Sequence, residues 1–206
     1  MFAYYILLAF IIVAGIYEEK VIQQSRNSCP SKRNLAIIVF LILFTFTVIR
    51  DSSVGGDLPN YAYKLQIEAV RATFLMALKD PHVDFGFYAL LIIISRFTTN
   101  IRSIMVVTAV ISLPLLMITF YRYSKRIWLS VYLFIIWGGF VYLFSGLRAM
   151  IAISFVLYAF HFIEKKKPFR FMVIIIIASL FHKTALIALP MYYYSNRRLK
   201  KILQYT

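Results

Sequence analysis

The longest apolar run of the chain, residues 128–162, contains 35 residues and a single formally charged side chain, Arg148. Backbone N–H and C=O groups find no water inside a bilayer, so an apolar run of about 20 residues crosses it as a helix. Gly138-Gly139 and Ser145-Gly146 interrupt this run. We therefore predict two membrane-spanning helices that meet near residues 145–148.

The composition of the whole chain favours the same class, because 62% of its 206 residues are hydrophobic and its mean hydropathy is +0.78. The net charge of +15 comes from basic residues in short clusters between apolar runs. That pattern is typical of cytoplasmic loops and excludes a nucleic-acid-binding surface. We predict an all-α, polytopic integral membrane protein, a single transmembrane domain over residues 1–206 with about seven or eight apolar helices. The basic clusters are 20–33, 122–126, 165–170 and 197–201.

The other apolar runs predict further helices, joined by polar loops such as residues 18–34. One run, residues 85–95, is too short to span a bilayer and predicts an interfacial or re-entrant helix. Pro114 is expected to kink the helix that contains it. The other predicted helices are 2–17, 35–49, 103–121, 171–180 and 185–194.

The positive-inside rule places all four basic clusters in the cytoplasm. The first and second clusters are separated by three apolar runs, so this placement requires that residues 85–95 do not cross. The N-terminus is then outside and the C-terminus inside. Labelling of a cysteine at position 148 from the cytoplasm only would contradict this topology. The polar residues left outside are Arg50, Asp57, Asp84, Arg148, His182 and Lys183.

An external loop and an amphipathic helix are predicted over residues 50–84. Apolar side chains recur every three or four residues over 61–79, which is the spacing of one helix face. Two interpretations of this helix are open: it lies on the membrane surface, or it packs on the protein. The residues of the apolar face are Tyr63, Ile67, Val70, Phe74 and Leu78.

The start of this loop carries candidate chemistry. Arg50 could hold a phosphate through its planar fork of donors, or could reach the lipid headgroups as arginines at span ends do. Gly55 and Gly56 allow the backbone a close approach to a ligand, and they also suit a plain turn. Asp57 could take a proton from a hydroxyl group.

Three further residues are candidates for the same site. Arg148 is costly inside apolar sequence and is either functional or reaching the headgroups. His182 could act as an acid, a base or a structural hydrogen-bond donor. Asp84 either acts in the site or caps the following helix. Arginines without a metal signature indicate an anionic substrate such as a lipid phosphate. Tyr61 and its aromatic neighbours could stack on sugars or belong to an interfacial belt.

No metal or cofactor is expected. The chain has one cysteine, Cys29, and its three histidines, at 82, 161 and 182, are widely spaced and form no metal-ligand motif.

Four short motifs occur in a fixed order between residues 35 and 195: Arg50-x4-Gly-x-Asp-x3-Tyr61, Asp-Phe-Gly-Phe at 84–87, Gly-Leu-Arg-Ala-Met-Ile-Ala at 146–152, and Phe-His-Lys-Thr-Ala-Leu-Ile-Ala-Leu-Pro at 181–190. Together they resemble the EpsG family, the Wzy-like bacterial polysaccharide polymerases. The chain differs from that pattern at Asp84, where the family more often has Glu, and at Ala149, where it usually has Gln. Because family members usually extend further, the resemblance implies a short or truncated member.

The resemblance implies a glycosyltransferase in the bacterial plasma membrane, acting in exopolysaccharide or capsule biosynthesis. A sugar hydroxyl would attack the anomeric carbon of a glycan held on polyprenyl diphosphate, and the lipid diphosphate would leave. The expected partners are polyprenyl-pyrophosphate-linked oligosaccharide, the bilayer and other polysaccharide assembly proteins. Arg148, with Arg50, would hold the diphosphate. Asp57 would be the base or the group that orients the acceptor, and His182 is the second candidate.

Two other functions are compatible with the sequence. One is a non-catalytic component of glycan export, either a lipid-linked glycan transporter or a partner subunit. A transporter is expected to carry several charges inside its spans, whereas Arg148 is alone between 128 and 162. The other is a glycan acyltransferase, for which His182 would be essential and Asp57 dispensable.

Overall fold

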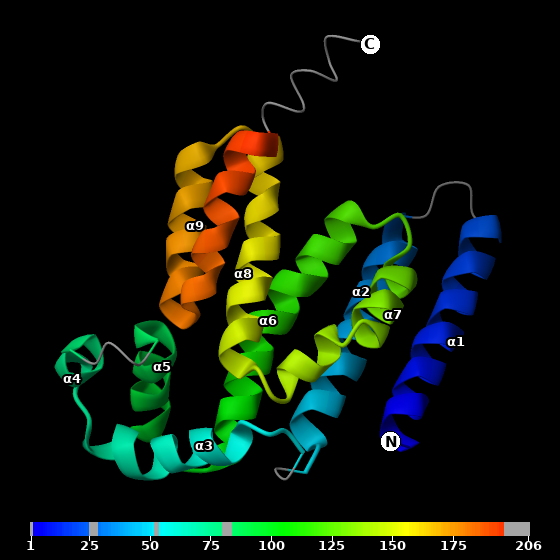
Figure 1. Cartoon of the computed structure of the whole chain (residues 1–206). Coiled ribbons are helices and arrows are strands. Elements are labelled where there is room, and N and C mark those ends of the chain that lie inside the picture. Colours follow the sequence, from blue (N-terminus) through cyan, green and yellow to red (C-terminus); the bar gives the residue numbers. More distant parts are fainter. Residues whose placement is uncertain (1, 25–28, 52–53, 80–83, 196–206) are drawn as a thin grey trace. The chain divides into compact units, whose positions relative to one another are not determined.

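The computed structural model describes residues 2–24, 29–51, 54–79 and 84–195. Every regular element in these ranges is a helix, so the predicted all-α class is confirmed (Figure 1). Among the described residues, three helices are long and apolar enough to cross a membrane. The numbers of spans and of apolar helices stay predictions. The three are α2 over Lys32–Ile49, α6 over Ile101–Tyr123 and α8 over Leu147–Glu164.

The helices sort into two compact units. Unit 1 consists of Met1–Pro59 and Met105–Leu147, and unit 2 consists of Asn60–Ile104 and Arg148–Thr206.

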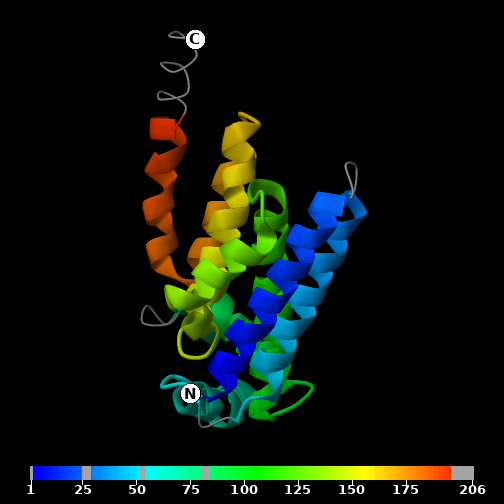
Figure 2. The same cartoon turned by 90° about the vertical axis from the view of Figure 1, so that its right-hand side faces the viewer.

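Unit 1 is built around α1 (Phe2–Gln24), which packs against α2 (Cys29–Ile49) and α7 (Ile127–Ile136). Figure 2 shows α1 and α2, both in blue, running side by side. The prediction of a loop over residues 18–34 is wrong at both ends, because α1 continues to Gln24 and α2 already begins at Cys29.

Two acidic residues explain why α1 continues past its apolar part. Glu18 is only 2% exposed, and its carboxylate accepts hydrogen bonds from the backbone N–H groups of Ile127 and Trp128 at the start of α7. Glu19 Oε1 lies 2.7 Å from Arg126 Nη1. The acids of the predicted loop therefore bind the first turn of α7, where the unpaired N–H groups and the helix dipole favour negative charge.

The first and second basic clusters meet at one end of unit 1. Lys32 Nζ donates a 2.8 Å hydrogen bond to the carbonyl of Ser124 and lies 5.1 Å from the centroid of the Tyr121 ring. This contact agrees with a topology in which these clusters share one membrane face. The orientation itself stays a prediction, and the cluster at 197–201 lies outside the described residues.

The predicted span in the first half of the long apolar run is not one continuous α-helix, and whether this segment crosses the membrane stays a prediction. Helix α7 has 10 residues and ends where Gly138 adopts a left-handed φ of +81°. A 3-10 helix, η2 (Gly139–Leu143), follows before α8 begins at Leu147. The Gly138-Gly139 pair turns the chain because glycine accepts the left-handed region without steric cost.

In unit 2, the predicted amphipathic helix is present but interrupted. It begins as α3 (Leu58–Tyr63), continues as the π-helix η1 (Lys64–Ala69), breaks at residues 72–73 and resumes as α4 (Phe74–Lys79). Helix η1 packs on α5 (Phe85–Ser95), which favours packing on the protein.

The face of this helix that packs is not the predicted one. Four of the five predicted apolar residues are exposed: Tyr63 by 55%, Ile67 by 49%, Val70 by 38% and Phe74 by 50%. The side chain of the fifth, Leu78, lies outside the described part of the chain. The buried residues are Tyr61, Leu65, Ala69 and Ala72. The segment thus carries two apolar faces, one covered by the protein and one open.

The rest of unit 2 is a helical layer of α8, α9 (Pro168–Phe181) and the 3-10 helix η3 (Lys183–Ala188). Figure 1 shows α8 and α9, in yellow and orange, packed beside each other. The break predicted around residues 181–184 is confirmed, because α9 ends at Phe181 and the chain is extended at His182. Their common core contains Ala159, Ile163, Phe171, Ile175 and Ala188.

Candidate functional site

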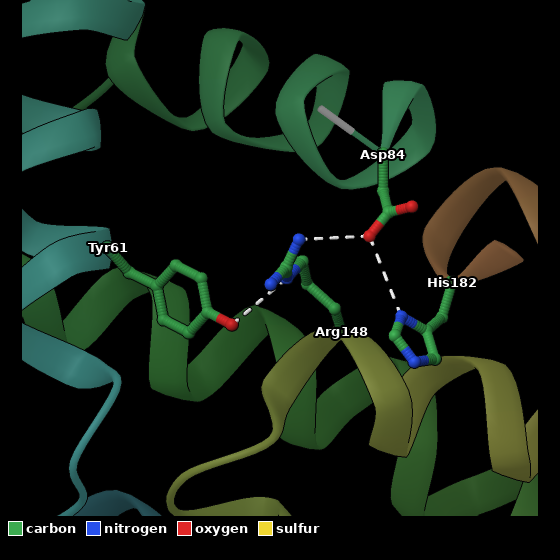
Figure 3. A network of polar contacts seen from close by, with 4 residues as sticks. All are labelled: Tyr61, Asp84, Arg148 and His182. Atoms are coloured by element: carbon green, nitrogen blue, oxygen red, sulfur yellow. Dashed lines mark hydrogen bonds and ion pairs between the residues drawn. The ribbon is translucent and has the colours of Figure 1, made fainter. Parts of the chain in front are cut away.

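Four polar side chains meet in unit 2, each from a different element (Figure 3). Arg148 Nη1 donates to Asp84 Oδ2 at 2.9 Å, and Arg148 Nε donates to the Tyr61 hydroxyl at 3.1 Å. His182 Nδ1 lies 3.6 Å from the same Asp84 oxygen. The sequence predicted each of these residues for the site, and the structure brings them together.

Burial divides the cluster into a covered part and an open part. Tyr61 is 5% exposed and Asp84 is 8% exposed, whereas the side chains of Arg148 and His182 are 37% and 35% exposed. The Tyr61 ring packs against Phe87 with 4.9 Å between ring centroids. The buried carboxylate and phenol therefore hold one side of the guanidinium, and the guanidinium and the imidazole are both partly open to the outside.

Asp84 directly precedes α5, but its side chain does not cap that helix. Its backbone is extended, with φ −73° and ψ 106°, and its carboxylate makes no capping hydrogen bond. The alternative that Asp84 serves as a side-chain cap is therefore wrong. The carboxylate instead binds Arg148, which lies 64 residues away in the chain.

Gly86 explains how Asp84 and His182 come within reach of each other. A Cβ added at Gly86 would lie 2.9 Å from the backbone carbon and oxygen of Leu180 in α9, closer than a Cβ normally approaches. The absence of a side chain thus lets α5 pack on α9 near its end, next to His182. Gly86 lies in the Asp-Phe-Gly-Phe motif at 84–87, and the Gly-Phe pair is the local signal for this close approach.

His182 sits where α9 ends, with φ −156° and ψ 115°. Its Nδ1 is buried and has no hydrogen-bond partner among the described residues, because 3.6 Å to Asp84 is too long for a hydrogen bond. The distance does suit an ion pair once the ring is protonated. A carboxylate in that position steadies an imidazole that accepts a proton at its other nitrogen.

A second cluster lies in unit 1, where Arg50 binds the segment before α8. Arg50 Nη1 donates to the Leu143 carbonyl at 3.1 Å, Nη2 donates to the Phe144 carbonyl at 3.4 Å, and the guanidinium carbon lies 4.4 Å from the centroid of the Phe144 ring. Burial lowers the pKa of Arg50 to about 10, which leaves it charged at neutral pH. These contacts serve the protein's own backbone, so the substrate-binding role of Arg50 stays a prediction.

The two predicted glycines belong to the same unit 1 cluster. Gly55 has φ +124°, and a Cβ there would lie 2.4 Å from the Phe144 carbonyl oxygen. The Gly56 N–H donates to Ser145 Oγ at 3.3 Å. Both glycines therefore fasten residues 54–57 to residues 143–145. Asp57 follows them in the chain and is partly exposed.

No three His, Cys, Asp or Glu side chains within the described ranges lie together as metal ligands would.

Comparison with known families matches the EpsG family model to residues 33–206. The matched range includes Tyr61, Asp84, Arg148 and His182. The comparisons with curated proteins and with solved structures gave no significant match.

Proposed function

Because the chain belongs to the EpsG family, we propose that it is a membrane glycosyltransferase of the polysaccharide polymerase type. It joins oligosaccharide repeat units carried on polyprenyl diphosphate in exopolysaccharide or capsule biosynthesis. The observation that carries this proposal is the partly exposed Arg148 guanidinium, held on one side by Asp84 and Tyr61.

The reaction makes one bond and breaks one. The oxygen of an acceptor sugar hydroxyl bonds to the anomeric carbon of the donor glycan, and the bond from that carbon to the diphosphate breaks. The electron pair leaves with the lipid diphosphate, and the hydroxyl proton passes to a base. The site must therefore hold a developing negative charge and accept one proton.

Arg148 is the group proposed to hold the diphosphate. A guanidinium pairs with phosphate through parallel N–H donors, and fixed donors stabilise charge best because they need no reorganisation during the reaction. Asp84 and Tyr61 supply that fixed orientation. Once His182 has accepted the hydroxyl proton, the cluster has a net charge of +1 (Arg148 +1, His182 +1, Asp84 −1), opposite in sign to the leaving group.

His182 and Asp57 are the two proposed bases. His182 is favoured by its place in the cluster, where Asp84 lies 3.6 Å from Nδ1 and the side chain is 35% exposed. Asp57 keeps the role expected from the family resemblance. His182→Gln and Asp57→Asn separate the two, because the variant that removes the base is expected to lose about 100-fold or more of the polymer.

The product distinguishes the polymerase from the other functions. An acyltransferase would also need His182, but its loss would remove acyl groups and leave the length of the glycan unchanged. A non-catalytic export component would not join repeat units unless another enzyme were present. The wild-type chain and every variant would then give the same unjoined repeat units.

The cellular test uses a strain without its own copy and measures the length of the extracted glycan on a gel. We expect a ladder of repeats with the wild-type chain and a single repeat with Arg148→Lys or Arg148→Gln, because lysine carries the charge without the planar fork. Arg102→Gln is the matched control, an exposed arginine in the same unit, and should keep the ladder. Normal ladders from both Arg148 variants, at equal protein levels in the membrane, would refute the assignment.

A further inference from the structure

Unit 1 contains an open groove between α2 and α6, with a volume of about 500 Å³. Its walls are apolar and include Ile37 and Phe40 from α2 and Pro114 and Ile118 from α6. Ile37 is 51% exposed and Ile118 is 39% exposed. In helices long and apolar enough to span a membrane, these side chains would face lipid.

One end of the groove is basic. Arg33, near the start of α2, and Arg122, in the last turn of α6, both line it together with Tyr121. None of the residues lining the groove is acidic. Lys32, beside Arg33, contacts the Ser124 carbonyl just after α6 and the Tyr121 ring, so α2 and the end of α6 are joined at the basic end of the groove.

The length of the groove fits the headgroup and the adjoining part of one acyl chain of a lipid molecule. At about 1.5 Å per residue, the window Lys32–Ile49 is roughly 27 Å long, close to the apolar thickness of a bilayer. Arg33 therefore lies at headgroup level, and the walls extend to Phe40 and Pro114, roughly 10–12 Å deeper. Helix α2 packs chiefly on α1 and α7, which leaves its side toward α6 available.

We propose that this groove binds one anionic phospholipid from the leaflet at the basic ends of α2 and α6. Its phosphate lies between Arg33 and Arg122, the Tyr121 hydroxyl lies at headgroup level, and one acyl chain follows the apolar walls. The two arginines at the basic end of the groove favour anionic over zwitterionic headgroups, because only an anionic headgroup carries a net negative charge. The inference does not depend on the proposed glycosyltransferase activity.

The test measures lipid binding to the purified full chain by native mass spectrometry, with phosphatidylglycerol and phosphatidylcholine of identical acyl chains. We expect the wild-type chain to retain phosphatidylglycerol about tenfold more strongly. The affinity for phosphatidylglycerol should fall about fivefold for each arginine that the double variant Arg33→Gln/Arg122→Gln removes. Lys125→Gln, which removes an exposed charge at the same end but outside the groove, should change the affinity less than twofold.

Two further measurements distinguish lipid binding in the groove from lipid binding to general surface charge. Ala36→Phe fills the groove between the walls and should release the lipid although every charge remains. Millimolar inorganic phosphate should not displace it, because the acyl chain contributes to binding. Equal retention of both lipids, an equal loss with Lys125→Gln, full binding to a folded Ala36→Phe chain, or displacement by free phosphate would each overturn the proposal.

Discussion

At the scale of single residues, one oxygen connects the cluster in unit 2. Asp84 Oδ2 lies 2.9 Å from Arg148 Nη1 and 3.6 Å from His182 Nδ1. A buried carboxylate is stabilised by the guanidinium that it faces, and the same oxygen lies beside the imidazole. We therefore propose that Asp84 positions Arg148 and His182, the groups proposed to touch the substrate.

Replacing this carboxylate tests that role. We expect Asp84→Asn to lower polymer formation about 100-fold, because the guanidinium loses its fixed orientation. Asp84→Glu should recover most of the polymer, since it keeps the charge. The glycan length on a gel and the amount of protein in the membrane are the two measurements. Full activity of Asp84→Asn would show that Arg148 needs no such partner.

The sequence was a good guide to which residues matter and a poor guide to how they pair. Arg148 and Asp84 were recognisable as a charged residue in apolar sequence and as part of a motif. Their ion pair joins positions 64 residues apart, so no local spacing predicts it. Arg50 was expected at the ligand, yet its Nη1 and Nη2 groups donate to the carbonyls of Leu143 and Phe144. These contacts span 93 and 94 residues and likewise have no local signal.

At the scale of helices, the contact between α5 and α9 decides whether the cluster forms. The predicted bounds of α5, Phe85–Ser95, agree with the structure, because Asp84 and the apolar run mark both ends clearly. The predicted end of a helix was wrong where charged residues continue it, as Glu18 and Glu19 do in α1. The predicted packing face was wrong in the amphipathic segment, because the segment has two apolar faces and the periodicity indicated only one of them.

A methyl group at Gly86 tests the helix contact. We expect Gly86→Ala to destabilise the protein by about 1–3 kcal/mol, because its Cβ meets the Leu180 backbone, which cannot move aside as a side chain can. The measurement is the midpoint of thermal unfolding in detergent, expected to fall by on the order of 5 °C.

Gly56→Ala is the matched control for stability, since a Cβ at that position has nothing within 4 Å. It should leave the midpoint nearly unchanged. Equal midpoints for Gly86→Ala and the wild-type chain would mean that α5 and α9 can separate without cost, and the account of how Asp84 reaches His182 would be wrong.

At the scale of the whole molecule, the family match over residues 33–206 and three helices of spanning length support a membrane enzyme. Composition alone predicted the helical membrane class, because hydropathy depends on local sequence. The division into two compact units had no such signal, since it depends on which helices contact each other. The predicted topology, with the N-terminus outside, stays a prediction.

The most direct measurement of the central claim uses the purified chain in lipid vesicles with a polyprenyl-diphosphate-linked repeat unit as the only glycan. The release of free polyprenyl diphosphate is followed together with the length of the glycan. We predict release coupled to elongation with the wild-type chain and at least about 100-fold slower release with Arg148→Gln. Release by Arg148→Gln at the wild-type rate, with glycan of the same length, would contradict the role of Arg148 at the leaving group.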